Sequence, residues 1–273
     1  MARRTRLSAC IITYNEERNL VAALESVSFV DEIIVVDSHS TDQTRSVALA
    51  FAEQGKRGGK GPALRLIEKD WPGHIEQKNH AIQQATHDWV LCIDADERVS
   101  PELRQEVDEI LAQETPEAMG YTMPRKTRYL GKWIYRGGWY PDRKLRLFNR
   151  QSGSWSGTNP HDHVFVTGKV EHLGGALEHY SYRDMKSHIR TINSYTDIFA
   201  RESLDKRIRF SVLRTVFHPL GKFVRMYVLK QGFREGTVGF IVAVLGAFYV
   251  FLKYAKLWEL RSMGPVNIEK PGK

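Results

Sequence analysis

DWVLCIDADERVS, residues 88–100, runs from an apolar segment directly into three acids, Asp94, Asp96 and Glu97. A near-continuous apolar run is typical of a strand that is covered on both faces of a parallel sheet. Carboxylates so close together repel one another, which is unfavourable at the end of a buried strand. The stretch therefore predicts a partner that neutralises these acids.

The residues before and after this stretch alternate strand-like runs with helical patterns. The strand-like runs are residues 7–13, 32–37, 63–68 and 89–94. The helical patterns are residues 19–28, 42–54, 75–86 and a segment that begins after Ser100, the expected N-cap. This βαβα order predicts an α/β fold with a doubly wound, Rossmann-like and mostly parallel sheet.

The remaining chain has a different pattern. Residues 115–183 are irregular and rich in aromatics, which predicts a small mixed α+β region with a hairpin that turns at 167–169. Residues 184–273 are predicted to be helical, with one helix to about 204 and amphipathic basic helices over 209–231 and 237–262. The Gly/Lys-rich stretch 53–63 precedes a strand and lacks a Gly-Lys-Ser/Thr ending, so we expect a surface loop.

Charge and composition limit the classes of protein and partner that fit this chain. The hydrophobic content of 42% suits a globular protein, and the net charge of +8 is concentrated in residues 201–262, which hold twelve Lys/Arg against four Asp/Glu. A basic surface beside apolar helices favours an anionic membrane face and argues against nucleic acid as a partner. The apolar run 238–252 is shorter than a spanning helix, so we expect it to lie in the membrane interface, to pack on other helices or to form a homodimer.

Two further features of the sequence predict the cellular compartment of the protein. Cys10 and Cys92 both stand inside apolar runs, which predicts buried free thiols and no disulfide. The apolar stretch near the amino terminus is about six residues long, too short for a signal peptide. We therefore expect a cytoplasmic protein that is peripherally associated with the inner membrane.

Polar residues follow three of the predicted strands, at residues 13–17, 37–44 and 94–97. In an open parallel sheet, ligands bind beyond the carboxyl ends of the strands, so these segments should share one crevice. Carboxylates there suit the hydroxyls of a nucleotide and a hard divalent cation. Mg²⁺ or Mn²⁺ on a nucleoside diphosphate would relieve the repulsion among the acids.

Three stretches resemble the successive motifs of family 2 glycosyltransferases with the GT-A fold: SACIITYNEERNL, VDEIIVVDSHSTDQT and WPGHIEQKNHAIQQATHDWVLCIDADERVSPEL. They keep the order of that family over residues 7 to about 112. The later KLRLFNR, LEHYSYRDMKSHI and Gly-Phe-x-Glu-Gly stretches are similar to the branch that holds the lipopolysaccharide core β-1,4-glucosyltransferases. The resemblance implies a nucleotide-sugar-binding half at 1–114, an acceptor region at 115–183 and a membrane-associating tail at 184–273.

The resemblance also implies roles for individual residues. Residues expected to line the nucleotide pocket are Thr13, Asn15 and Glu16. Asp37 is expected to contact the base, and Lys78 and Asn79 to lie near the base or diphosphate. Asp94 would face the ribose or donor sugar, and Asp96 would bind the metal. Independently, a diphosphate favours a cation such as Lys78.

The chain departs from the family in lacking both the Glu-Asp pair that supplies the general base and the Gln-x-x-Arg-Trp motif. The predicted base is Asp162 in GTNPHDHVFV, and the alternative is a surface turn. His179 is the candidate for a further metal ligand, with a purely structural histidine as the alternative.

Arg143 and Arg146 are candidates for gripping a phosphate, or they are solvated. The aromatics Trp133, Trp139 and Tyr140 either stack on sugars or pack the second region. In the tail, basic residues alternate with apolar ones in the manner of an interfacial helix. The basic residues are Arg214, Lys222, Arg225, Lys230 and Arg234, and the apolar ones are Phe217, Phe223, Met226 and Tyr227.

The sequence thus predicts an inverting, metal-dependent hexosyltransferase. The expected partners are a UDP-sugar, glucose being the predicted sugar, and a lipid-linked envelope saccharide such as the lipopolysaccharide inner core. One alternative is transfer to a polyprenyl phosphate, which needs no general base. Another is a non-catalytic, membrane-bound scaffold with the same fold. A sugar nucleotidyltransferase is disfavoured because TYNEE is acidic where a triphosphate would bind.

Overall fold

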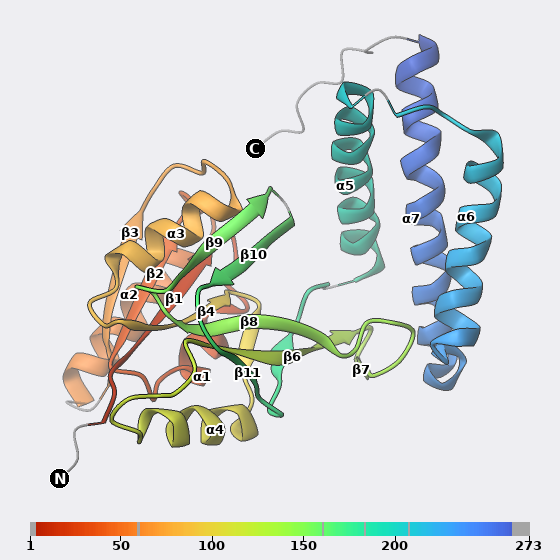
Figure 1. Ribbon diagram of the computed structural model, residues 1–273. Coiled ribbons are helices and arrows are strands. Elements are labelled where there is room, and N and C mark those ends of the chain that lie inside the picture. The colour runs from red at the N-terminus through yellow and green to blue at the C-terminus, as the bar shows by residue number, and fades with distance from the viewer. Residues whose placement is uncertain (1–3, 59–60, 160, 183, 207, 264–273) are drawn as a thin grey trace. The chain divides into compact units, whose positions relative to one another are not determined.

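A parallel sheet forms the first part of the computed structural model, which describes residues 4–58, 61–159, 161–182, 184–206 and 208–263 (Figure 1). Its strands β1 (Leu7–Thr13), β2 (Glu32–Asp37), β3 (Ala63–Glu68) and β4 (Trp89–Asp94) have the predicted bounds. They run parallel in the order β3-β2-β1-β4. The connecting helices are α1 (Leu20–Ser26), α2 (Thr44–Gly58), α3 (His74–Gln84) and α4 (Pro101–Leu111).

Antiparallel strands extend this sheet beyond β4. β8 (Asp142–Asn149) pairs with β4, and β6 (Gly120–Tyr129) pairs with β8. β12 (Leu177–His179) lies next in order and pairs with β5 (Glu97–Val99), while β7 (Lys132–Ile134) and β11 (Val170–His172) pair with β6. β9 (Gly153–Thr158) and β10 (His161–Val166) form a separate two-stranded sheet.

Two sequence predictions were wrong here. The segments around 167–169 do not form a hairpin, because β10 pairs with β9 and β11 runs parallel to β6. Apolar packing explains why β10 pairs with β9 and not with β11, since Trp155 of β9 and Val164 of β10 join the core cluster on the α3 face of the sheet. The expected loop at 53–63 is helical over 53–58, because α2 continues to Gly58; residues 59 and 60 lie outside the described part.

The core lies on both faces of the sheet. Alternate residues of β1 point to opposite sides, so that Ile11 joins one cluster and Cys10 the other. Cys10 and Cys92 are buried and free, as predicted. Burial on both faces accounts for the continuous apolar runs of the parallel strands.

The chain divides into two compact units. The first contains residues up to Lys126 and Pro141–Ser181, and the second contains Thr127–Tyr140 and the residues from Tyr182 onward. The predicted boundary after residue 114 falls inside the first unit, where β6 and β8 continue the sheet. The predicted start of the tail at 184 falls beside the start of the second unit's helical part.

The second unit is built on helices. They are α5 (Met185–Asp205), α6 (Val212–Val224) and α7 (Gly236–Met263), with a π-helical turn at Arg225–Leu229 after α6. Asp184 caps α5, because its carboxylate accepts a 2.7 Å hydrogen bond from the Ser187 amide. His188 bonds to the Tyr129 hydroxyl at 2.9 Å, and burial lowers the pKa of His188 to about 4.

The segment Gly232–Met263 is longer than the apolar run 238–252 suggested. By length and composition it is the one helical segment in the described part of the chain that could cross a membrane. An apolar core helix of a soluble protein passes the same test.

We predict that Gly175→Ala destabilises the first unit. A Cβ at Gly175 would overlap the backbone of Leu103 in α4, which cannot move as a side chain can. The free energy of unfolding should fall by about 1–3 kcal/mol, measured by urea denaturation. The matched control is Gly174→Ala, whose Cβ would meet only the flexible Glu106 carboxylate at 3.2 Å. Equal stability of the two variants would contradict the packing argument.

Candidate active site

The loops that follow β1 and β2 form one wall at the carboxyl edge of the sheet. The Ser38 amide donates to the Thr13 carbonyl at 3.0 Å, and the Asn15 amide donates to Ser40 Oγ at 2.9 Å. In return, Asn15 Oδ1 accepts from the Thr41 amide at 2.8 Å. Asn15 has a φ of 54°, a left-handed conformation that asparagine tolerates. Sequence-predicted Thr13 and Asn15 thus lie side by side with the loop after β2.

Glu16 and Asp37 support the same wall. The Glu16 amide donates to Thr44 Oγ1 at 2.8 Å, which joins the first loop to the start of α2. Asp37 is fully buried, and its carboxylate accepts from the amide and hydroxyl of Ser40 at 2.8 and 2.5 Å. In this structure Asp37 positions Ser40; its contact with a base stays a prediction.

Two polar atoms behind this wall lack partners. Thr13 Oγ1 and Gln77 Oε1 are buried and make no hydrogen bond within the described residues. Gln77 Nε2 donates to Ser38 Oγ at 3.1 Å, which places α3 beside the loop after β2. An unsatisfied buried polar atom costs about 1–3 kcal/mol, so these atoms mark a place where a polar ligand or water would be favourable. Sequence reasoning missed Gln77, although it adjoins predicted Lys78.

A buried lysine connects two acids from distant strands. Lys78 Nζ of α3 lies 3.1 Å from Asp94 Oδ1 at the end of β4 and 2.8 Å from Asp162 Oδ2 in β10. Its side chain is only 8% exposed, and the ammonium stands 4.2 Å from the centre of the Trp155 ring. This cation–π contact adds to the two ion pairs. Predicted residues Lys78, Asp94 and Asp162 therefore meet at one point.

Arg146 of β8 holds the other side of Asp94. Its Nη2 atom lies 3.0 Å from Asp94 Oδ2 and 2.9 Å from Glu97 Oε1. Glu97 is fully buried and also contacts Arg125 Nη1 at 3.2 Å. Sequence reasoning proposed Arg146 for phosphate and did not pair it with these acids. KLRLFNR carries no local signal for this pairing, because Arg146 meets Asp94 and Glu97 only after β8 has paired with β4.

These contacts correct the expectation that a metal neutralises all three acids. Burial alone would raise the pKa of Asp94, but Lys78 and Arg146 hold it well below its ordinary value. Burial would likewise lower the pKa of Arg146, but Glu97 and Asp94 raise it. Asp94 and Glu97 are thus neutralised by cations of the protein. Asp96 is the acid left for another partner.

Asp96 and His179 come together across 83 residues of sequence. β12 pairs with β5 so that His179 lies opposite Glu97, and His179 Nε2 is 3.2 Å from Asp96 Oδ2. Both side chains are partly exposed, at 24% for Asp96 and 13% for His179. In the described residues no three His, Cys, Asp or Glu side chains form a metal-binding group. A carboxylate and an imidazole nevertheless fit a cation whose remaining ligands are phosphate and water oxygens.

The other predicted residues have defined contacts. Asp162 lies within β10 and is 14% exposed, so the surface-turn alternative was wrong. The Asn79 amide bonds to the backbone N and O of Trp155, at 2.9 Å each, and so fixes β9 on α3. Arg143 donates to the Leu173 carbonyl at 3.0 Å. In the second unit, Trp139 packs on Tyr129 and does not stand free for a sugar.

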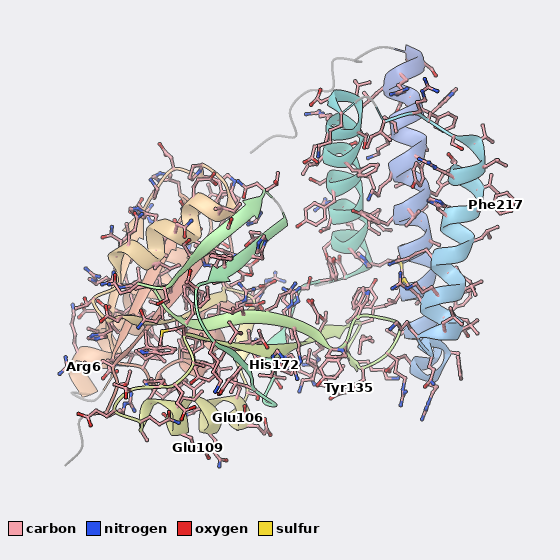
Figure 2. All side chains as sticks on the ribbon, viewed as in Figure 1. Arg6, Glu106, Glu109, Tyr135, His172 and Phe217 are labelled. Carbon is pink, nitrogen blue, oxygen red and sulfur yellow. The ribbon has the colours of Figure 1, made fainter. Side chains whose placement is uncertain are left out.

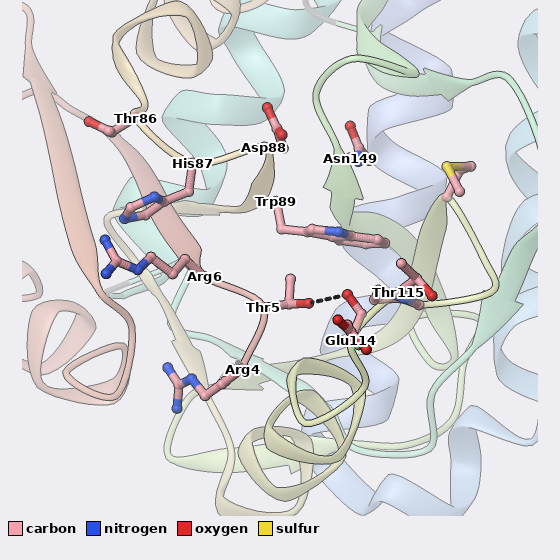
Figure 3. A pocket seen from close by; sticks show the side chains of 12 residues that line it. Arg4, Thr5, Arg6, Thr86, His87, Asp88, Trp89, Glu114, Thr115 and Asn149 are labelled. Atoms are coloured by element: carbon pink, nitrogen blue, oxygen red, sulfur yellow. Dashed lines mark hydrogen bonds between the residues drawn. The ribbon is translucent and has the colours of Figure 1, made fainter. Parts of the chain in front are cut away.

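A cavity lies at the opposite, amino-terminal edge of the strands. Its volume is about 620 Å³, and its lining includes Arg4, Arg6, His87 and Trp89 (Figure 3). None of the sequence-predicted site residues lines it. The carboxyl edge, where ligands of doubly wound sheets bind, therefore remains the candidate active site.

The fold and the site define an α/β protein whose ligand site lies at the carboxyl edge of its parallel strands. The family model described as glycosyl transferase family 2 matches residues 8–171. The chain is 31% identical over 259 residues to the lipopolysaccharide core biosynthesis glycosyltransferase LpsC of Rhizobium meliloti, covering 94% of this chain and 93% of that protein. It is also 31% identical over 266 residues to an uncharacterized glycosyltransferase of Rickettsia typhi, covering 93% and 87%.

One solved structure has a fold similar to that of this chain. The mannosyltransferase PcManGT from Pyrobaculum calidifontis, in complex with GDP-Man and Mn²⁺, aligns with a TM-score of 0.58 and 15% identity, covering 94% of this chain and 88% of that one. The chain belongs to glycosyl transferase family 2 and has the GT-A fold, as the sequence motifs indicated.

We predict that Arg146→Met lowers the free energy of unfolding by about 3–5 kcal/mol, because it leaves Glu97 buried without its closest cation. Urea denaturation at neutral pH measures the loss. Arg143→Met is the matched control, since Arg143 is exposed and donates to the Leu173 carbonyl, and it should lose far less.

The pH dependence should change as well. The folded pKa of Asp94 is lowered, so its contribution is complete above the ordinary value of about 3.9 and is lost as the pH falls below it. Without Arg146 this acid-dependent loss should be smaller than in the wild type. An identical pH slope in both proteins would disprove the role of Arg146 in ionising Asp94.

Proposed function

We propose that this family 2 glycosyltransferase moves a hexose, glucose from UDP-glucose, with inversion onto a lipid-linked envelope saccharide such as the lipopolysaccharide inner core. The observation that carries the proposal is the double ion pair of Lys78. Because Asp94 Oδ1 and Asp162 Oδ2 contact the same Nζ atom, they lie within about 6 Å of each other. The acid proposed to face the donor and the proposed base are therefore neighbours.

The reaction follows from these positions. Asp94 orients the ribose or donor sugar, and Lys78 offers positive charge to the diphosphate. An acceptor hydroxyl attacks the anomeric carbon, the bond from that carbon to the diphosphate oxygen breaks, and the hydroxyl proton passes to the Asp162 carboxylate. Asp96 and His179 would hold Mg²⁺ or Mn²⁺, which when bound stabilises the negative charge of the departing diphosphate.

The comparisons support a nucleotide-sugar donor and a part in lipopolysaccharide core biosynthesis at a coarse level. LpsC is named for lipopolysaccharide core biosynthesis, and its similarity extends over most of both chains. PcManGT shares the fold and was solved with a nucleotide sugar and Mn²⁺. The choice of glucose, of uridine and of a heptose acceptor belongs to the proposal.

The second unit supports a membrane location. α6 exposes large apolar side chains, among them Leu213, Phe217 and Leu220, which are 69%, 62% and 57% exposed. Basic residues such as Arg214 and Arg225 alternate with them. Each cation near anionic lipid contributes about 1 kcal/mol. We propose that this unit holds the enzyme on the inner face of the inner membrane, where a lipid-linked acceptor is found.

The metal assignment predicts that Asp96→Ala abolishes metal-stimulated turnover. Hydrolysis of UDP-, GDP- and dTDP-sugars should be measured with Mn²⁺ and Mg²⁺, and the variant should lose at least about 100-fold. Asp108→Ala is the control, because Asp108 is a partly exposed acid of α4. Equal turnover by wild type and Asp96→Ala would remove the metal site. No turnover of any donor by the wild type would favour the scaffold alternative.

The proposed base predicts that Asp162→Asn transfers about 10²–10⁴-fold more slowly to a saccharide hydroxyl while it still binds the donor. Transfer to a heptose-containing oligosaccharide and to a polyprenyl phosphate should be measured side by side. A phosphate acceptor needs no base, so retained transfer to polyprenyl phosphate would favour that alternative. Calorimetry with the donor separates loss of the base from loss of the Lys78 contact.

A further inference from the structure

Two lysines of the second unit, Lys222 and Lys253, reach α7 beside Gly246 and Tyr249, which lie about one helical turn apart. The register of α6 against α7 is set by a 2.8 Å hydrogen bond between His218 Nδ1 and Tyr254 Oη. One turn further along α6, Lys222 passes beside α7, where a Cβ at Gly246 would lie 3.8 Å from Lys222 Cε. Lys253 stands on α7 between these two contacts. Both lysines are partly buried.

Aromatic rings surround Lys253. Its ammonium lies 3.7 Å from the centre of the Phe199 ring in α5 and 5.2 Å from that of Tyr249. Burial lowers the pKa of Lys253, and the charge of Lys222 lowers it further. Burial also lowers the pKa of Lys222, followed by the charge of Arg225. The helices thus bring like charges together in a place that disfavours charge.

No acid in the described part of the unit compensates this cluster. Three of the described acids of the unit pair with other lysines: Asp197 with Lys256, Glu235 with Lys132 and Glu202 with Lys206. None of the ion pairs in the described chain includes Lys222, Arg225 or Lys253. Buried cations are ordinarily paired, so this cluster suits an anion from outside the protein.

The surroundings of the cluster suit an anion that carries hydrocarbon. On α6, Phe217, Leu220 and Val224 are 62%, 57% and 47% exposed, and on α7 Phe251 is 44% exposed. Phe217 projects away from the other helices (Figure 2). A free ion would leave these side chains in water, whereas the acyl chains of a lipid would cover them.

We propose that Lys222 and Lys253, with Arg225 beside them, bind the phosphate of an anionic membrane lipid. The proposal rests on the membrane location inferred above and adds a defined site to it. A phosphate presents several acceptor oxygens, so it can take hydrogen bonds from both ammonium groups at once. Its acyl chains would lie along the exposed apolar side chains of α6 and α7.

The test is flotation of the full chain with vesicles, either of phosphatidylcholine alone or with a fraction of phosphatidylglycerol. Loss of one cation near anionic lipid lowers affinity about fivefold, so the double variant Lys222→Gln/Lys253→Gln should bind the anionic vesicles at least about tenfold more weakly. The matched control is Lys186→Gln/Arg201→Gln, which removes two exposed charges from α5 and should stay within about twofold of the wild type.

Further measurements distinguish a defined lipid site from general electrostatic attraction and from a site for free phosphate. Lys222→Arg/Lys253→Arg keeps the charges and should bind as the wild type does; weak binding by this variant would overturn the proposal. Equal losses in the glutamine variant and the control would also overturn it, since general attraction would then suffice. If the wild type bound inorganic phosphate but floated no better with anionic than with phosphatidylcholine vesicles, the site would be one for free phosphate and not for lipid.

Donor hydrolysis in solution distinguishes this site from the proposed function. The glutamine variant should hydrolyse the nucleotide sugar as fast as the wild type, because neither lysine belongs to the candidate active site. An inactive wild type that still requires Lys222 and Lys253 for vesicles would refute the glycosyl transfer alone. An active enzyme that binds vesicles equally well with and without phosphatidylglycerol would refute the lipid site alone.

Discussion

The contact between Arg146 and Asp94 is the constraint on which the candidate site depends. β4 ends in acids that would repel one another, and β8 delivers a buried guanidinium to two of them. Buried ion pairs contribute little net stability, because the loss of hydration offsets most of the attraction. Their effect is specificity of arrangement: any register of β8 that removed Arg146 would leave the buried Glu97 without its closest cation. The chemistry of the site and the pairing of the strands are therefore coupled.

The cluster also divides the acids by role. Asp94 contacts a cation on each side, Lys78 and Arg146, so both of its oxygens are held in place. Glu97 is fully buried and serves as an anchor for Arg146 and Arg125. Asp96 faces His179 at a partly exposed position, and it is the acid that we propose to bind a cation. Three acids in one short stretch thus act differently because each meets a different partner.

The loops after β1 and β2 form a wall that is held together by its own hydrogen bonds. Asn15, Asp37 and Ser40 satisfy one another through hydrogen bonds, which positions the loops without a ligand. Thr13 Oγ1 and Gln77 Oε1 are left without a partner in the described residues. The second unit has a comparable imbalance of charge at Lys222 and Lys253, where no described acid is paired with either lysine. In both places the protein holds polar groups for which an external partner would be favourable.

The sequence by itself determined the parallel strands, the Ser100 cap of α4 and the buried cysteines, because these depend on local apolar pattern and neighbouring residues. It also singled out Lys78 and Asp94, which the structure brings into contact, and its motifs indicated the family. The partner of Arg146, the burial of Glu97, the meeting of Asp96 with His179 and the pairing of β10 with β9 were decided only by the tertiary structure. Strand order sets these contacts, since residues remote in sequence meet only after whole strands have paired, and no local pattern records which strand lies next to which.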